Sequence, residues 1–505
     1  MELELRGITK RFPGVVANDD VNLTIRSGEV LALVGENGAG KSTLMNILYG
    51  LYHADEGQIY VDGEPVTFES PGDAIAAGIG MVHQHFMLVP VFTVAENVVL
   101  GVEPTGPLGR LDRAKAHDQV EEISAQYGLH LDPEALIEQL PVGIQQRVEI
   151  LKVLFRDAKI VVFDEPTAVL TPQEIEEFFK IVESLKASGR GIVFITHKLT
   201  EALRIADRIS VLRRGQTVGE ADPAEIDEVA LAEMMVGRPV QLVVDKEPAQ
   251  PRDATLQVRD LHVVDPTGRT LVDHVDFTVH AGEIVGVAGV QGNGQTELVE
   301  ALTGLREILG GSVQVDGVDL TDSSPREVHQ AAVAHIPEDR QRSGLVGAFT
   351  VAENMVLTRY HDDQFSDGIR MDWDTARSTA TTLVEQYDVR TPSIATPAGT
   401  LSGGNQQKVI VARELSRDLR LVIASQPTRG VDVGSIEYIH AQVVLARDAG
   451  AAVLVVSTEL DEVMALADRV LVMYRGRIVA DLARDETTHN EVGLYMAGAK
   501  QQEPA

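Results

Sequence analysis

The stretch that decides the fold is Gly35-Glu-Asn-Gly-Ala-Gly40-Lys41-Ser42-Thr43, which follows the apolar run 30–34. It satisfies the pattern G-x-x-x-x-G-K-[S/T], in which a glycine-rich loop joins a strand to a helix. The glycines let successive backbone N–H groups surround an anion, and the lysine reaches the outer phosphates. We therefore expect a nucleotide phosphate site here. Its residues are Gly35, Glu36, Asn37, Gly38, Ala39, Gly40, Lys41, Ser42 and Thr43.

Two adjacent acids, Asp164 and Glu165, end the apolar run 159–163. Hydroxyl and carboxylate oxygens suit Mg²⁺, so Ser42 and Asp164 are expected to hold a magnesium ion. Glu165 stands at the end of the strand and is expected to turn toward the terminal phosphate as the general base for an attacking water. Such a pair is often a solvated turn on its own, but the upstream phosphate loop favours the catalytic interpretation.

The sequence contains the same pattern twice. FTVAENVVL at 92–100 returns as FTVAENMVL at 349–357, and ADRISVLRRG from Ala206 returns as ADRVLVMYRG from Ala467. Repeats this far apart mark two homologous domains rather than solenoid units. The segment between them has the proline and charge content of an exposed linker. The expected boundaries are 3–240 for the first domain, 241–255 for the linker and 256–500 for the second domain.

Each half alternates short β-branched runs, such as 159–163 and 191–195, with longer segments of helical period, such as 172–188. This alternation is typical of an α/β fold with a largely parallel sheet and crossover helices. Ligands of such folds bind at the carboxyl ends of the strands, which is where the phosphate loop falls.

Composition excludes several classes of protein. The 505 residues carry 44 Lys+Arg against 76 Asp+Glu, and the net charge of −32 disfavours nucleic acid as a partner. The absence of cysteine excludes disulfides, thiolate nucleophiles and cysteine zinc sites. The N-terminal residues do not read as a signal peptide, and no apolar run approaches the ~18 residues that span a bilayer. We expect a soluble, cytosolic chain.

These features resemble the ATP-binding cassette (ABC) family over nearly the whole chain and in both halves. The resemblance implies tandem P-loop ATPase domains that bind ATP and Mg²⁺ and pack head-to-tail. It also implies that Gln84 touches Mg²⁺ and the membrane partner, that His197 contacts the terminal phosphate, and that Phe12 stacks on adenine. With Lys41 and Glu165, His197 completes the expected catalytic set.

The second half keeps the glycines of the phosphate loop but loses the charged groups. Gln295 stands where the first half has Lys41, which removes a charge-assisted contact worth about 1.5–3 kcal/mol. Ser425 and Gln426 replace the acid pair, and an amide cannot accept the proton. Thr458 replaces the histidine. The expected degenerate site comprises Gly289, Gly294, Gln295, Thr296, Ser425, Gln426 and Thr458, faced by Pro141 and Val142 of the first half.

In the ABC family a signature loop opens a helix and donates hydrogen bonds to the γ-phosphate held by the opposite domain. The second half keeps this loop as Ser402, Gly403, Gly404 and Asn405. In the first half, Pro141 lacks a hydroxyl and Val142 carries a β-branched side chain. A head-to-tail pair would therefore have one competent composite site and one defective site.

This arrangement predicts an asymmetric response to mutation. Ser402→Ala removes a γ-phosphate contact, so we expect an about tenfold to hundredfold loss of steady-state ATPase rate. Pro141→Ala should change the rate little, because the site that it faces is already defective. The rates are measured at saturating ATP in the chain reconstituted with its permeases. A silent Ser402→Ala, or a more damaging Pro141→Ala, contradicts the composite site.

Fused cassettes with one degenerate site resemble the ATPase subunits of bacterial importers for nucleosides and monosaccharides. The resemblance implies two integral-membrane permease subunits, an extracytoplasmic solute-binding lipoprotein, and a peripheral position on the cytoplasmic face of the cell membrane. Partner helices are expected beside 84–90 and 338–340. Nucleic acid is not an expected partner.

The stretches HQHFMLVPVFTVAENVVLG and ASQPTRGVDVG are most similar to the nucleoside branch of these importers. A monosaccharide cargo of the ribose, galactose or xylose type is the alternative. A soluble twin-cassette ATPase of translation or DNA repair is disfavoured by the short linker, the dead site and the charge of −32. A nucleotide sensor without hydrolysis is disfavoured by Glu165 and His197.

Overall fold

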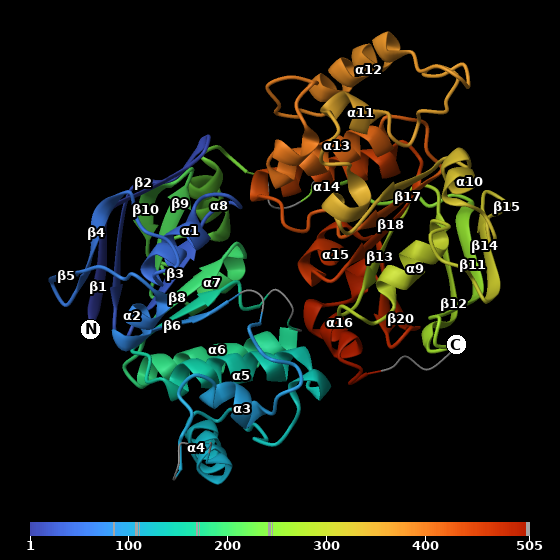
Figure 1. Cartoon of the computed structure of the whole chain (residues 1–505). Helices are drawn as coiled ribbons and strands as arrows, with labels where there is room; N and C mark the ends of the chain where they lie inside the picture. Colours follow the sequence, from blue (N-terminus) through green and yellow to red (C-terminus); the bar gives the residue numbers. More distant parts are fainter. Residues whose placement is uncertain are drawn as a thin grey trace. The chain divides into compact units, whose positions relative to one another are not determined.

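The computed structural model describes residues 1–83, 86–106, 110, 112–167, 170, 172–240, 244 and 246–500. The chain divides into two compact units, Met1–Val240 and Gln241–Ala505. Within the described residues, each unit repeats nearly the same succession of strands and helices (Figure 1), as the sequence repeat predicts.

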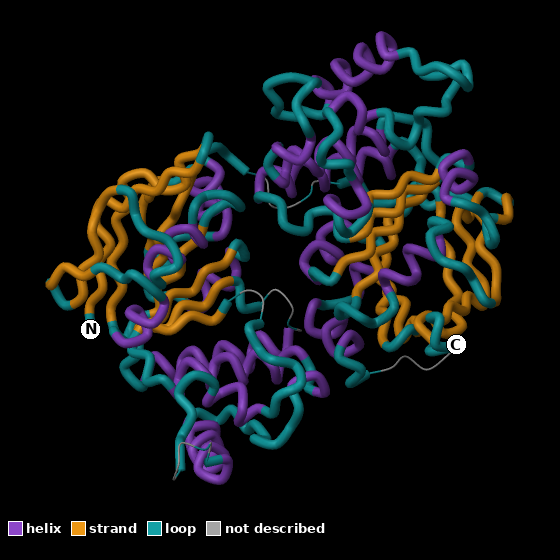
Figure 2. The backbone as a smooth tube through the Cα atoms, in the orientation of Figure 1, coloured by secondary structure: helices purple, strands orange, loops and turns teal. Residues whose placement is uncertain are grey.

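The first unit contains two sheets, whose strands are orange in Figure 2. The strands are β1 Glu2–Phe12, β2 Val15–Arg26, β3 Val30–Val34, β4 Glu56–Val61, β5 Glu64–Val66, β6 Ile79–Val82, β7 Ile160–Asp164, β8 Gly191–Thr196, β9 Arg208–Arg213 and β10 Gln216–Ala221. One sheet is antiparallel, in the order β2-β1-β4-β5. The other has the order β10-β9-β3-β8-β7-β6 and is parallel except at β10.

The helices of the first unit follow the alternation that the sequence predicts. They are α1 Lys41–Leu48, α2 Pro71–Ala76, α3 Val94–Val99, α4 Arg113–Gln126, α5 Val142–Phe155, α6 Pro172–Ala187, α7 Leu199–Ile205 and α8 Glu228–Val236, with a 3₁₀ turn at Ile137–Gln139. The apolar runs expected as strands are confirmed as β3, β7 and β8, and the segment 172–188 is confirmed as α6.

The parallel sheet of the first unit is buried on both faces. Val30 and Phe163 pack on one side, in a core shared with α3, α4, α5 and α6. Leu31 and Leu33 pack on the other side, against α1 and the antiparallel sheet. Strands covered on both faces become continuous apolar runs, which is why β3 and β7 show no polar alternation. β3 therefore lies in a middle layer, between one group of helices and the antiparallel sheet with α1.

The repeated FTVAEN sequence builds a helix start. Thr93 and Glu96 form a capping box at the beginning of α3, in which each side chain bonds the backbone N–H of the other residue. The buried Asn97 then accepts from Val89 N–H at 2.7 Å and donates to Val89 C=O at 3.1 Å, which fixes the preceding loop. The second unit repeats these contacts around Asn354.

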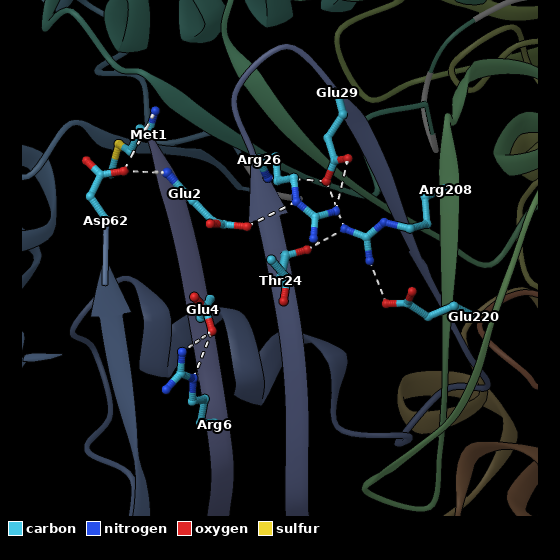
Figure 3. Close-up of polar contacts among 10 residues, drawn as sticks. All are labelled: Met1, Glu2, Glu4, Arg6, Thr24, Arg26, Glu29, Asp62, Arg208 and Glu220. Atoms are coloured by element: carbon cyan, nitrogen blue, oxygen red, sulfur yellow. Dashed lines mark hydrogen bonds and ion pairs between the residues drawn. The ribbon is translucent and has the colours of Figure 1, made fainter. Parts of the chain in front are cut away.

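The repeated Ala-Asp-Arg sequence ties neighbouring strands together, and Figure 3 shows the contacts of its arginine, Arg208. Asp207 accepts from the first N–H of β3 at 2.8 Å. Arg208 donates to Glu29 at 2.8 Å, to Glu220 and to the carbonyl of Thr24. One guanidinium thus joins β2, the start of β3, β9 and β10.

The second unit has the same two-sheet organisation. Its strands are β11 Ala254–Val264, β12 Thr270–His280, β13 Ile284–Ala288, β14 Gly310–Val315, β15 Val318–Asp319, β16 Val333–Ile336, β17 Leu421–Ser425, β18 Ala452–Ser457, β19 Arg469–Tyr474 and β20 Arg477–Ala483. The antiparallel sheet has the order β12-β11-β14-β15, and the mostly parallel sheet has the order β16-β17-β18-β13-β19-β20. Asp468 and Arg469 repeat the contacts of Asp207 and Arg208.

The helices of the second unit also correspond to those of the first. They are α9 Gln295–Leu302, α10 Pro325–Gln330, α11 Val351–Met355, α12 Trp373–Gln386, α13 Gly403–Leu415, α14 Val433–Asp448, α15 Leu460–Leu466 and α16 His489–Met496. Short turns of helix lie at Arg340–Gly344, Ala398–Thr400 and Arg484–Glu486. None of the helices in the described ranges combines the length and apolarity needed to cross a bilayer.

Two features differ from the sequence expectations. The four-stranded antiparallel sheets were not predicted, since only a largely parallel sheet was expected. In addition, part of the expected exposed linker is docked on the second unit. Lys246 Nζ donates to Asp468 Oδ1 and to the carbonyl of Leu466, both at 2.7 Å. Arg447 donates to the carbonyl of Glu247 at 3.0 Å. A charged side chain in a linker can hydrogen-bond to protein groups as well as to water. Composition alone therefore does not show that a linker is exposed to solvent.

Candidate active site

The phosphate loop of the first unit lies between β3 and α1. Gly38 and Gly40 have positive φ angles of 80° and 101°, and Gly40 is the N-cap of α1. A Cβ at Gly40 would lie 2.2 Å from the carbonyl oxygen of Ala17, and one at Gly35 would lie 2.2 Å from that of Leu212. Glycine is therefore required at both ends of the loop, because other backbone approaches it closely.

Lys41 is buried inside this loop. Its side chain is 6% exposed, and Nζ donates to the carbonyls of Gly35 at 2.7 Å and Glu36 at 3.0 Å. Burial lowers the pKa of Lys41, while the nearby charges of Glu165, Asp164 and Glu36 act in the opposite direction. The ammonium group thus lies at the expected phosphate position, where two backbone carbonyl groups accept its hydrogen bonds. Asn37 lies exposed at the tip of the loop.

The expected acid pair lies beside Lys41, at the end of β7. Asp164 is the last residue of the strand and forms a hydrogen bond with the side chain of Ser42. Burial, followed by the neighbouring charge of Glu165, raises the pKa of Asp164 to about 6. Glu165 has a left-handed backbone with φ of 47°, and its N–H donates to the carbonyl of Ile195 at 3.0 Å. This turn lets both carboxylates approach Lys41, which simple strand alternation would not do.

His197 is the group that holds Glu165. The His197 Nδ1 atom lies 3.1 Å from Glu165 Oε1. Burial alone would raise the pKa of Glu165. The hydrogen bond with His197 and the charges of His197, Lys41 and Lys198 outweigh burial, so the pKa of Glu165 lies below its usual value. Glu165 is therefore ionised at neutral pH, in the form that accepts a proton.

The oxygen atoms of Ser42 and Asp164 fit a magnesium ion. A hydroxyl and a carboxylate are the ligands that Mg²⁺ prefers in proteins. The raised pKa of Asp164 also indicates that its negative charge is not fully compensated by the residues around it. A divalent cation would supply that compensation. Gln84, the third expected ligand, lies outside the described residues.

Phe12 lies at the end of β1 with 38% of its side chain exposed. Its ring meets Tyr52 edge to face, with centroids 5.6 Å apart, and Lys10 Nζ lies 5.7 Å from its centroid. Two exposed aromatic rings thus stand together on the first unit. Sequence reasoning selected Phe12 and missed Tyr52, for which the only signal was a second aromatic residue shortly after α1.

The second unit keeps the backbone of this site without its charges. Gly294 caps α9 with φ of 103°, and Gln426 has φ of 48°. Gln295 is 6% exposed, and its Nε2 has no hydrogen-bond partner among the residues that are described. Thr458 Oγ1 donates to Gln426 Oε1 at 3.1 Å, in the position of the His197–Glu165 contact. Ser425, the last residue of β17, is buried.

An ion pair that the sequence analysis did not predict lies beside Thr296. The Thr296 hydroxyl donates to Glu338 Oε2 at 3.2 Å, and the other oxygen of Glu338 accepts from Arg429. Arg340 donates to the carbonyls of Arg429 at 2.7 Å and Gly430 at 3.2 Å. The carboxylate that accepts from Thr296 is thus paired with an arginine.

The two signature loops differ as the sequence suggests. Pro141 is the N-cap of α5 without a side-chain hydrogen bond, and Val142 is exposed. Ser402 is the N-cap of α13, and its Oγ accepts from Asn405 Nδ2 at 2.9 Å rather than from the helix backbone. A Cβ at Gly404 would lie 2.2 Å from a side-chain oxygen of Ser435. At Gly403 a Cβ would lie 2.8 Å from the Arg340 guanidinium.

The difference between the phosphate loops predicts a difference in nucleotide affinity. Lys41→Ala removes a charge-assisted contact to phosphate, so ATP affinity at the first unit should fall about tenfold to hundredfold. Gln295→Ala is the matched change in the second unit, and it removes no charge. Titration of the full chain with a fluorescent ATP analogue in the presence of Mg²⁺ measures both effects. Equal losses in the two variants would contradict the assignment.

Comparison with known proteins identifies the family of the chain. The family profile described as "ABC transporter" matches residues 18–168 and 272–429. The chain belongs to the ABC transporter family, with an ATP-binding cassette in each unit.

Three relatives align with almost the full chain. The chain is 49% identical over 496 residues to the nucleoside import ATP-binding protein NupA of Lactococcus lactis subsp. cremoris (strain MG1363), covering 98% of both. It is 48% identical over 501 residues to the guanosine import ATP-binding protein NupO of Bacillus subtilis (strain 168), covering 99% of this chain and 98% of that one. It is 46% identical over 525 residues to the glucose import ATP-binding protein TsgD13 of Haloferax volcanii, covering 98% and 96%.

A solved structure with similar full-length coverage is the complex of archaeal ribosomal stalk protein aP1 and archaeal ribosome recycling factor aABCE1. The TM-score is 0.60 at 20% identity, over 94% of this chain and 90% of that chain. At this identity the likeness concerns the fold alone.

Proposed function

We propose that this chain is the ATP-hydrolysing subunit of an importer and that its first cassette performs the hydrolysis. The observation that carries this proposal is the convergence of Lys41, Asp164, Glu165 and His197 in the first unit. The corresponding positions of the second unit hold Gln295, Ser425, Gln426 and Thr458, of which none is charged.

The residues of the first cassette have separate roles in the proposed reaction. Lys41 exchanges its two carbonyl partners for phosphate oxygens. Glu165 accepts the proton of the attacking water, and His197 holds the Glu165 carboxylate in place and contacts the terminal phosphate. Ser42 and Asp164, with Gln84, would hold Mg²⁺. When bound, that ion neutralises the charge that develops on the phosphate oxygens.

We infer that a membrane permease docks beside the loop that follows β6. A cavity of about 160 Å³ opens there, lined by residues that include Tyr49, His83, Met87, Glu149 and Arg156. Met87 is 63% exposed, and an apolar side chain at that exposure is a ready contact for a partner helix.

The contacts of this loop link the cavity to the signature helix. Met87 N–H donates to Glu149 Oε1 at 2.5 Å, and Lys152 Nζ donates to Met87 C=O at 3.1 Å. Both Glu149 and Lys152 belong to α5, which the first unit's signature loop opens. A partner that moves the loop would therefore also move α5, and this connection would pass nucleotide-driven motion to the permease.

The proposed assembly has two permease subunits and an extracytoplasmic solute-binding lipoprotein, and the chain lies peripherally on the cytoplasmic side of the membrane. A nucleoside is the proposed cargo, supported by the similarity to NupA and NupO. A monosaccharide is the second candidate, because the similarity to TsgD13 is only slightly lower.

The test is transport by the chain reconstituted in proteoliposomes with the permeases and binding protein encoded beside it. We expect guanosine or another nucleoside outside the vesicle to stimulate ATP hydrolysis and to accumulate inside. Glu165→Gln in the same assembly is the control for coupling. Stimulation by ribose or glucose but by no nucleoside would assign the second cargo. Stimulation by ribosomes without permeases would overturn the importer.

A further inference from the structure

A cluster of metal-ligating side chains lies on the antiparallel sheet of the second unit, outside the nucleotide site. His262 belongs to β11, and Asp273 and His274 belong to β12. One nitrogen from each histidine and one oxygen from Asp273 all lie within 4.8 Å of one another. The two imidazole rings are nearly parallel, at 14°, with centroids 4.9 Å apart.

A β-bulge brings these residues together. Leu261 pairs with Val275 and Val263 pairs with Val272, so two residues of β12 lie opposite His262 alone. His274 adopts φ of 53° at this bulge. Bulges redirect side chains, which lets the consecutive residues Asp273 and His274 approach the same partner.

The first unit has the same bulge with different chemistry. Asp19 and Asp20 lie opposite Thr9, Asp20 has φ of 53°, and Asp20 N–H donates to the hydroxyl of Thr9 at 3.1 Å. The histidines are therefore not needed to form the bulge. They are a property of the second unit alone.

The contacts around the cluster resemble the outer contacts of a metal site. His274 Nδ1 lies 2.6 Å from Asp260 Oδ1, and the other ring nitrogen, Nε2, faces Asp273. Asp273 Oδ2 accepts from Arg477 Nε at 2.6 Å, and the other carboxylate oxygen, Oδ1, faces His274. A histidine that binds a metal usually has its other nitrogen on a carboxylate, and a ligating carboxylate is usually hydrogen-bonded.

The facing atoms of His274 and Asp273 are not hydrogen-bonded to each other. His274 Nε2 and Asp273 Oδ1 are 4.0 Å apart, which is too far for a hydrogen bond. Two ligand atoms of a tetrahedral zinc ion lie roughly 3.4 Å apart, so a shift of under about 1 Å would bring these two atoms to that separation. His262 Nδ1 is buried and has no hydrogen-bond partner within the described part of the chain. The local charge favours a cation, because Asp260 contacts His274, Asp276 accepts from the backbone N–H of Asp260, and only Asp273 of these three carboxylates has an arginine partner among the described contacts.

We propose that His262, Asp273 and His274 bind one divalent transition-metal ion, with zinc as the best match. Two imidazoles and one carboxylate suit zinc, whereas Mg²⁺ and Ca²⁺ prefer oxygen ligands. His274 is exposed, so the fourth position is open to water. The ion would cross-link β11 and β12 at the bulge and stabilise the second cassette.

This site is linked to the degenerate phosphate loop by two backbone hydrogen bonds. Asp273 N–H donates to the carbonyl of Gly476 at 2.9 Å, and Gly476 N–H donates to the carbonyl of Asn293 at 2.8 Å. Metal binding would therefore steady the loop that contains Gly292 and Gly294. The proposal does not depend on what the importer carries.

The test uses the full chain without an affinity tag, stripped of metal and titrated with Zn²⁺ by calorimetry and with Co²⁺ by visible absorption. We expect one Zn²⁺ per chain, tetrahedral Co²⁺ bands, and a rise in the melting temperature with Zn²⁺. His274→Ala and His262→Ala should abolish all three. Asp260→Asn should weaken binding by about tenfold to hundredfold, as expected for an outer contact.

His489→Ala is the matched control, because His489 is an exposed histidine 3.2 Å from a carboxylate oxygen of Asp461. It should leave the titration unchanged. The exposed His274 keeps the test valid even if His262→Ala fails to fold. The proposal is overturned if the wild-type chain binds no Zn²⁺, if binding survives His274→Ala, or if His489→Ala weakens binding as strongly.

Discussion

Glu165→Gln is expected to stop ATP turnover while ATP stays bound. The amide has the shape of the carboxylate but cannot accept the proton of the attacking water, and general base catalysis contributes about 10²–10⁴-fold to such reactions. The steady-state rate should fall by at least that factor. Lys41 and its loop are unchanged, so nucleotide affinity should be retained. Phosphate release gives the rate, and equilibrium binding of labelled ATP gives the affinity.

The control for this experiment is the reciprocal change, Gln426→Glu. It places a carboxylate at the equivalent turn of the second unit, where the backbone has the same left-handed form. Gln295 and Ser425 still lack the charges that bind phosphate and metal, so no second activity should appear. Near-normal turnover in Glu165→Gln would refute the catalytic base. A doubled rate in Gln426→Glu would refute the degenerate site.

Asp164→Asn is expected to stabilise the chain and to abolish its Mg²⁺-dependent hydrolysis. Burial, followed by the charge of Glu165, raises the pKa of Asp164 to about 6, above its usual value of 3.8. The folded chain therefore favours the protonated acid. The resulting stability is fully present below about pH 4 and is lost as the pH rises through 6. The uncharged asparagine avoids this loss of stability, but it removes the carboxylate that is expected to bind the metal ion.

The gain follows from the size of the pKa shift. About two pKa units correspond to about 3 kcal/mol, so the asparagine variant should gain about 1–3 kcal/mol at pH 7.5 and almost nothing at pH 4. Each kcal/mol raises the melting temperature of a domain this large by about 2–4 °C. Calorimetry at both pH values, without nucleotide or metal, measures the difference.

A matched control inserts the opposite change in the second unit. Ser425→Asp buries a carboxylate at the end of β17, where Gln295 stands in place of the lysine, so it should lower the melting temperature at pH 7.5. A destabilised Asp164→Asn variant, a gain that does not depend on pH, or preserved hydrolysis would each contradict the proposed state of Asp164.

Much of the fold follows from short sequence patterns. The phosphate loop, the apolar runs and the FTVAEN and ADR repeats each depend on residues that are close in sequence, so spacing alone predicts β3, α1 and the doubled architecture. The resemblance to a known family identified His197 as a contact of the terminal phosphate, and the structure adds its contact with Glu165. The roles of these residues remain proposals.

Other features depend on pairs that are distant in sequence and made of common residues. The Glu338–Arg429 ion pair and the anchoring of Lys246 on Asp468 give no local signal, because any surface carboxylate or ammonium is compatible with them. The antiparallel sheets were missed for a related reason. β1 and β2 are half-exposed and interrupted by bulges, which breaks the regular alternation that identifies such strands.

The second nucleotide loop has preserved its backbone after losing its chemistry. Gly294 has φ of 103° against 101° for Gly40, and Gln426 has φ of 48° against 47° for Glu165. A left-handed non-glycine residue costs about 1–3 kcal/mol, and the second unit still carries this strain although it has no carboxylate to aim. In the proposed function, a silent cassette would thus differ from a working one by a small set of side chains on the same loop backbone. Restoring the charged side chains of this loop would therefore require no change in its backbone conformation.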